Sequence, residues 1–111
     1  MSTLESATQR KFEYVVQSLQ SAPGVALGKR GFGVGSLQVH GRIFAMVSSK
    51  GEYVVKLSKA RVEALEGSGG GRRFDPGHGR LMKEWLVVAS TSKAEWLKLA
   101  IEAMNFVGTK S

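Results

Sequence analysis

Apolar side chains in the first part of the chain stand three and four positions apart, as they do on one face of an α-helix. Ser2 and Glu5 precede this stripe with the spacing of a capping box, and Pro23 and Gly24 interrupt it. The pattern predicts a first helix over residues 3–21. Its buried stripe is expected to comprise Leu4, Ala7, Phe12, Val15, Val16 and Leu19.

Short runs with strand-like patterns follow and are separated by turn residues. Residues 36–40 and 53–57 place apolar side chains at every second position, and residues 43–47 are apolar throughout. These runs predict an antiparallel meander of three strands. The preceding stretch, residues 25–35, is punctuated by glycines and predicts an irregular edge strand or a bulge.

The middle of the chain combines a short helical pattern with a glycine-rich, basic segment. Ser58 is placed to cap a helix over residues 59–66, and Gly67 is expected to end it. A flexible basic loop is predicted over residues 67–80. A strand over residues 84–89 follows, and its segment from Trp85 to Val88 is expected to anchor it in the core.

A last helical pattern closes the chain. Ser92 and Glu95 have capping-box spacing, and the apolar face of this helix runs through Val107 to a stop at Gly108. The predicted order is a helix, three or four strands, a helix, two strands of which the first is irregular, and a last helix. Helices that cover one face of an antiparallel sheet make a two-layer α+β domain.

Length and composition bound the class of protein. The 111 residues fit a single domain, residues 1–111, and a hydrophobic content of 42% suits one modest core. No apolar run of 18 residues exists, and the polar N-terminus lacks the apolar segment of a secretory signal. The absence of cysteine excludes disulfides and thiolate chemistry. We therefore expect a cytoplasmic protein that does not enter a membrane.

The net charge of +7 comes entirely from residues 28–83, where eleven basic residues face four acidic ones. A localised basic field suits a phosphate-rich partner, DNA or RNA first, whereas the alternative is that the charge serves only solubility. Phe74 lies among these residues, either to stack on a base or to pack at the core edge. The candidate nucleic-acid contacts are Arg72, Arg73, Arg80 and Lys83 of the predicted loop, and Lys29, Arg30 and Arg42 of the glycine stretch and a turn.

Catalytic patterns are scarce. His40 and His78 are the only histidines, and they belong to no HExxH pair. The serines form no GxSxG elbow, and Asp75 with His78 is more typical of a turn than of an acid–base pair. We expect no catalytic residues, no metal, no cofactor and no enzymatic activity.

Two predicted strands, residues 43–47 and 85–89, are apolar on both faces, although helices cover only one face of a two-layer domain. The uncovered side chains would then form a homodimer interface or bind a protein partner. Alternatively, the first helix or the long loop folds over them. The candidate interaction face comprises Phe44, Met46, Leu86 and Val88.

Several segments together resemble a known family. Residues 31–35 (GFGVG), 41–46 (GRIFAM), 55–57 (VKL) and 74–85 (FDPGHGRLMKEW), with a final helix near Trp96, are similar to the N-terminal domain of TfoX/Sxy-type proteins and to the related MmcQ/YjbR-like proteins. The resemblance covers nearly the whole chain. It implies a YjbR-like, secretion-chaperone-like α+β fold and DNA binding. Longer TfoX-type proteins regulate competence genes and carry a C-terminal domain as well.

Overall fold

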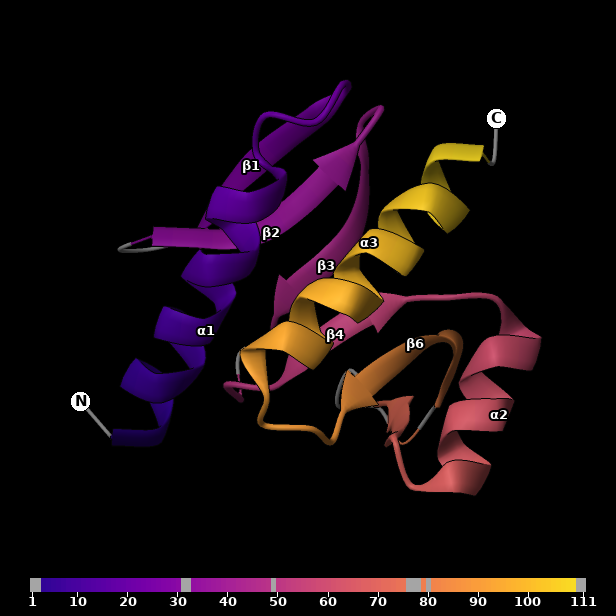
Figure 1. Cartoon of the computed structure of the whole chain (residues 1–111). Coiled ribbons are helices and arrows are strands. Elements are labelled where there is room, and N and C mark those ends of the chain that lie inside the picture. The colour runs from indigo at the N-terminus through magenta and orange to yellow at the C-terminus, as the bar shows by residue number, and fades with distance from the viewer. Residues whose placement is uncertain (1–2, 31–32, 49, 76–78, 80, 110–111) are drawn as a thin grey trace.

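The computed structural model describes residues 3–30, 33–48, 50–75, 79 and 81–109 (Figure 1). Within these residues, helices and strands follow one another in the predicted order, and the α+β class is confirmed. The elements are α1 (Thr3–Leu19), β1 (Val25–Arg30), β2 (Gly33–Val39), β3 (Arg42–Val47), β4 (Tyr53–Lys56), α2 (Lys59–Ser68), β5 (Gly71–Phe74), β6 (Met82–Val88) and α3 (Lys93–Thr109).

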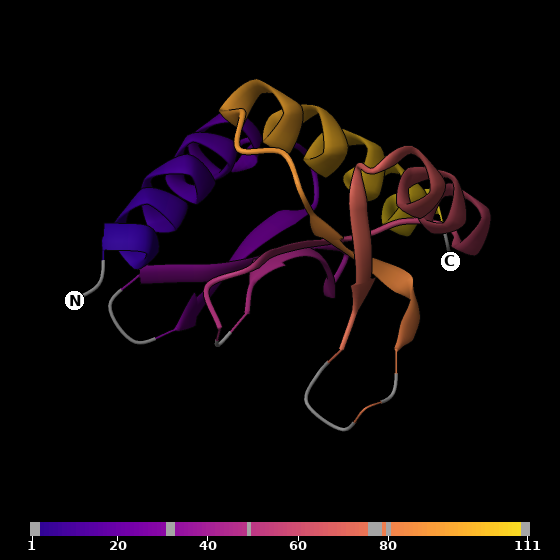
Figure 2. The same cartoon turned by 90° about the horizontal axis from the view of Figure 1, so that it is seen from below.

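The strands form one six-stranded sheet in the order β1-β2-β3-β4-β6-β5, with every neighbouring pair antiparallel. The helices of the described chain all lie on one side of this sheet (Figure 2). β1 forms one edge, and its register with β2 shifts between Gly28 and Lys29. The glycine-punctuated stretch therefore supplies the irregular edge strand that the sequence predicts, and β5 forms the opposite edge.

The core lies between the sheet and the helices. The predicted apolar faces of the two long helices are buried there, because their side chains recur at the helical period and so point to one side. These buried residues are Phe12, Val15, Val16 and Leu19 of α1, and Trp96, Leu99, Ala100, Ala103 and Val107 of α3.

Tyr53 of β4 joins the sheet to α3. Its ring stacks on Trp96 with centroids 4.1 Å apart, and its hydroxyl donates a hydrogen bond of 2.9 Å to the carbonyl oxygen of Trp96. Burial raises the pKa of the Tyr53 hydroxyl well above its usual range, because the charged form would lose its hydration. Tyr53 therefore marks the helix side of the sheet.

The second helix is longer than the sequence predicts. Ser58 caps it as expected, by accepting a hydrogen bond from the N–H of Arg61. Its end lies at Ser68, however, because Gly69 rather than Gly67 adopts the left-handed conformation (φ 84°) that closes the last turn. Gly67 is thus a helical residue, and the prediction that it ends the helix is wrong.

The predicted basic loop over residues 67–80 is in part a strand. Its residues 71–74 form β5, which pairs with β6 through Gly71–Val88 and Arg72–Val87. Gly71 permits this pairing, because a Cβ atom there would lie 2.3 Å from the carbonyl oxygen of Val87. Arg72 and Arg73 therefore have fixed, opposite directions, whereas a flexible loop would let both follow a ligand.

Candidate nucleic-acid interface

Successive side chains of β4 point to opposite faces of the sheet and so show which residues lie on each face. Tyr53 and Val55 belong to the core beneath the helices, so Val54 between them points to the other side. We call this other side the open face. The register places Met46 of β3 and Val87 of β6 beside Val54 on the open face.

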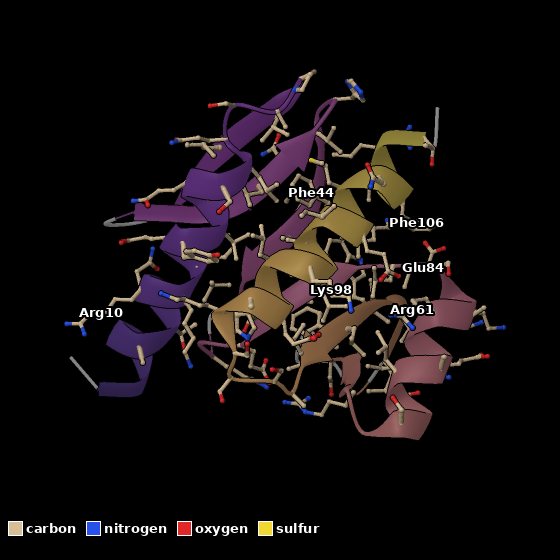
Figure 3. All side chains as sticks on the ribbon, viewed as in Figure 1. Arg10, Phe44, Arg61, Glu84, Lys98 and Phe106 are labelled. Atoms are coloured by element: carbon tan, nitrogen blue, oxygen red, sulfur yellow. The ribbon has the colours of Figure 1, made fainter. Side chains whose placement is uncertain are left out.

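The predicted interaction face requires a correction. Phe44, Leu86 and Val88 belong to the core beneath the helices, with exposed fractions of 0%, 0% and 8%, and Figure 3 shows Phe44 in this region. Phe44 joins Ala45 in the core because the register of β2 and β3 shifts beside it, between Leu37 and Gln38. Of the four predicted residues, only Met46 lies on the open face.

The open face carries a different apolar set, which we call the apolar patch. Trp85 belongs to the apolar patch because the next residue, Leu86, points into the core. Trp85 pairs with Lys56 of the neighbouring strand β4. The expectation that Trp85 anchors β6 in the core is therefore wrong. The apolar patch comprises Ile43, Met46, Val54, Trp85 and Val87.

Arg72 lies on the open face and spans part of the apolar patch. Its cross-strand partner is Val87, and its Nη2 forms an ion pair with Oε2 of Glu52, two residues before Val54. The aliphatic part of the side chain therefore crosses Val87, which helps to explain why Val87 is buried on a face that none of the described helices covers. The Arg72 side chain itself stays 61% exposed.

Lys56 and Lys83 complete a basic frame around Trp85. Nζ of Lys56 lies 5.3 Å from the centroid of the Trp85 ring and 4.0 Å from Oε1 of Glu84. Lys83 precedes Trp85 by two residues on β6, in the segment where the register of β5 and β6 shifts, and its side chain is exposed. We refer to Lys56, Arg72 and Lys83 as the basic frame.

Arg73 points away from this frame and ties β5 to α2. Its cross-strand partner is Leu86 of the core. Its Nε lies 3.1 Å from Oε1 of Glu66, and its Nη2 lies 3.7 Å from Oε2 of Glu63. The backbone N–H of Arg73 donates a hydrogen bond to Oε2 of Glu66. The guanidinium is engaged on the helix side of the sheet, and Arg73 therefore lies apart from the basic frame.

The remaining predicted basic residues do not join the frame. Lys29 and Arg30 lie on β1, at the opposite edge from β5, and five strand spacings put these edges about 24 Å apart. Arg42 begins β3 and pairs with Val39 of the core, which places it at the helix side of the sheet end. Arg80 and His78 lie outside the described residues.

The charge is divided between the two layers of the fold. Each helix holds two basic and two acidic residues, so none of them contributes to the net charge. The remaining ten basic residues, on strands, connections and the C-terminus, face only Glu52, Asp75 and Glu84, which accounts for the whole net charge of +7. Sequence position places this excess in residues 28–83. In the part of the chain that the structure describes, the strands and their connections carry eight basic residues against Glu52, Asp75 and Glu84.

Other kinds of site find less support in the described part of the chain. No helix there is long and apolar enough to cross a membrane, and no three potential metal ligands gather. His40 occupies the β2–β3 turn, where its N–H donates to the carbonyl oxygen of Gly24 and its ring packs beside that glycine. Phe74 is half-buried at the end of β5 and pairs with Met82.

Comparison of the chain with protein families, with curated proteins and with solved structures gave no match.

Proposed function

We propose that this protein binds nucleic acid through the open face of its sheet, with the basic frame of Lys56, Arg72 and Lys83 contacting phosphates. The observation that carries the proposal is the charge division, because helices without net charge leave the sheet layer as the source of the positive field. Neutralising phosphates releases counterions, which is the dominant sequence-independent contribution to nucleic-acid binding. The resemblance to TfoX/Sxy and YjbR-like proteins stays a prediction that points the same way.

The ion pairs of the basic frame do not prevent this role. Arg72 is 61% exposed in its pair with Glu52, and Lys56 and Glu84 are 29% and 35% exposed and 4.0 Å apart, so both pairs are open to solvent on at least one side. Ion pairs screened by solvent contribute about 0–1 kcal/mol. A phosphate carries a full negative charge and accepts hydrogen bonds from a guanidinium in a bidentate manner. Exchanging Glu52 for phosphate therefore costs Arg72 little.

A salt titration of binding tests the proposal. The double variant Arg72→Ala with Lys83→Ala should weaken binding to DNA or RNA and flatten the dependence of log K on log salt by about 1.4–1.8, since each lost contact removes about 0.7–0.9. Lys59→Ala with Lys98→Ala is the matched control, because it removes two exposed charges from helices. The control should lower affinity only slightly and leave the slope unchanged.

Two outcomes would overturn the proposal. Equal losses in both double variants would show that total charge matters and the open face does not. Binding that is absent, or insensitive to salt, would exclude a phosphate interface. If the protein instead forms a salt-resistant dimer, the apolar patch, in which Ile43 is 37% exposed, serves as a protein interface, which is the alternative that the sequence also predicts.

A further inference from the structure

Trp85 stands out among the residues of the open face. It is a partly exposed aromatic side chain on a sheet face without a helix among the described residues, and the ammonium group of Lys56 lies over its ring. A tryptophan in this position exposes a flat apolar surface beside cations. Bases in an unpaired strand stack on such surfaces, whereas bases in a duplex are already stacked on one another.

We propose that the open face binds unpaired nucleic acid, RNA or single-stranded DNA, by stacking a base on Trp85. This inference rests on the proposed function and specifies its ligand. The charge of the face fits the ligand, since Lys56 and Lys83 flank Trp85 and Arg72 lies beside Val87, the next residue of β6 on the same face. A strand laid along β6 would thus meet positive charge on both sides of the stacked base.

Lys56 already lies over the Trp85 ring, so a base must displace its ammonium group. An exposed ammonium–ring contact is worth about a 2- to 5-fold change in an equilibrium constant. Base stacking on an aromatic side chain is worth about 5- to 150-fold in affinity. Stacking of the base on the Trp85 ring is therefore more favourable than the ammonium–ring contact that it replaces. The displaced ammonium group of Lys56 then becomes available to the neighbouring phosphate.

The experiment compares three probes by fluorescence anisotropy at several salt concentrations: an oligothymidylate of about 12 nucleotides, an abasic strand of the same length, and a duplex of about 12 base pairs. The wild-type protein should bind the oligothymidylate about 5- to 150-fold more tightly than the abasic strand, and more tightly than the duplex. Trp85→Leu should abolish the preference over the abasic strand, since leucine keeps an apolar side chain without a ring. Trp85→Phe should retain most of it.

The salt slope separates stacking from phosphate binding. Trp85→Leu removes no charge, so its slope should match the wild type, whereas Arg72→Ala with Lys83→Ala should flatten it. Equal, salt-dependent affinity for the oligothymidylate and the abasic strand would overturn the stacking inference and leave the proposed function standing. Tighter binding of the duplex would also overturn it. Absence of binding to all three probes would overturn both.

Discussion

Tyr53→Phe removes one oxygen atom from the junction between the sheet and α3, and its effect should change sign with pH. The hydroxyl of Tyr53 is buried and donates to the Trp96 carbonyl oxygen at 2.9 Å, so its loss at neutral pH removes one buried hydrogen bond. Such a bond contributes about 1 kcal/mol to stability. The ring and its stacking on Trp96 are retained, so the fold should be unchanged.

The alkaline behaviour follows from the raised pKa of Tyr53. In the unfolded chain the hydroxyl ionises near pH 10, whereas burial keeps it protonated in the folded protein at that pH. Unfolding then releases a proton, so the contribution of Tyr53 to stability is complete below about pH 10 and declines as the pH rises further. At pH 11 the loss amounts to about 1.4 kcal/mol, since the unfolded side chain is then about ten-elevenths ionised.

Urea unfolding followed by circular dichroism, from pH 8 to pH 11, measures both effects. At pH 8 the wild type should be more stable than Tyr53→Phe by about 1 kcal/mol. Near pH 11 the order should reverse, with the variant more stable by about 0.4 kcal/mol. Parallel stability curves for the two proteins would refute the argument that the buried hydroxyl stays protonated. Equal stability at pH 8 would refute the hydrogen bond.

Two further stability comparisons test contacts around β5, each by urea unfolding. Gly71→Ala should destabilise the protein by about 1–3 kcal/mol, because the new Cβ atom would clash with the carbonyl group of a neighbouring strand. Gly67→Ala places its Cβ atom in open space on α2 and should stabilise the protein by up to about 1 kcal/mol. Similar effects of the two substitutions would contradict the roles assigned to these glycines. Arg73→Ala should cost about 1–2 kcal/mol, because its half-buried side chain loses ion pairs with both Glu63 and Glu66 while its backbone hydrogen bond is retained. Arg72→Ala should cost less than about 1 kcal/mol, so a reversed order would refute the division of the two arginines between the faces.

Helices were predictable because their signals are local. The stripe through Phe12 and Val16 repeats at the helical period, and the same holds for Trp96 and Ala103 of α3, so each helix could be recognised without knowledge of its neighbours. The class of the fold and the irregular edge strand β1 followed from similar local patterns, with glycines as markers.

The face of each strand residue was not predictable in the same way. The strands β3 and β6 are apolar at most positions, so alternation carries no information about which set faces the helices. The bulge opposite Leu37 turns Phe44 into the core, and only pairing with β4 shows that Trp85 and Val87 face outward. The sequence shows only that Trp85 and its neighbour Leu86 point to opposite faces of the sheet. The face of Trp85 can be predicted once the face of Leu86 is known.

Adjacent arginines illustrate the same limit for the candidate site. Arg72 and Arg73 differ by one position, yet pairing of β5 with β6 sends one to the open face and the other to Glu66 of α2. That pairing depends on a close approach at Gly71, which composition presents only as a glycine-rich segment. The charge excess and the balance of charge within each helix follow from the helices that the sequence predicts, whereas the faces to which Arg72 and Arg73 point required the structure.

The balanced charge of the helices has a consequence for how the molecule meets other molecules. A body with charge in one layer has an electric dipole, so an approaching polyanion exerts a torque that turns the sheet layer toward it before contact. Encounters would then be pre-oriented, and the association rate should fall as salt shortens the range of this torque. Exchanging charged residues on the helices while keeping each helix neutral should leave that rate unchanged, which makes the helix layer the place to attach a tag or a label.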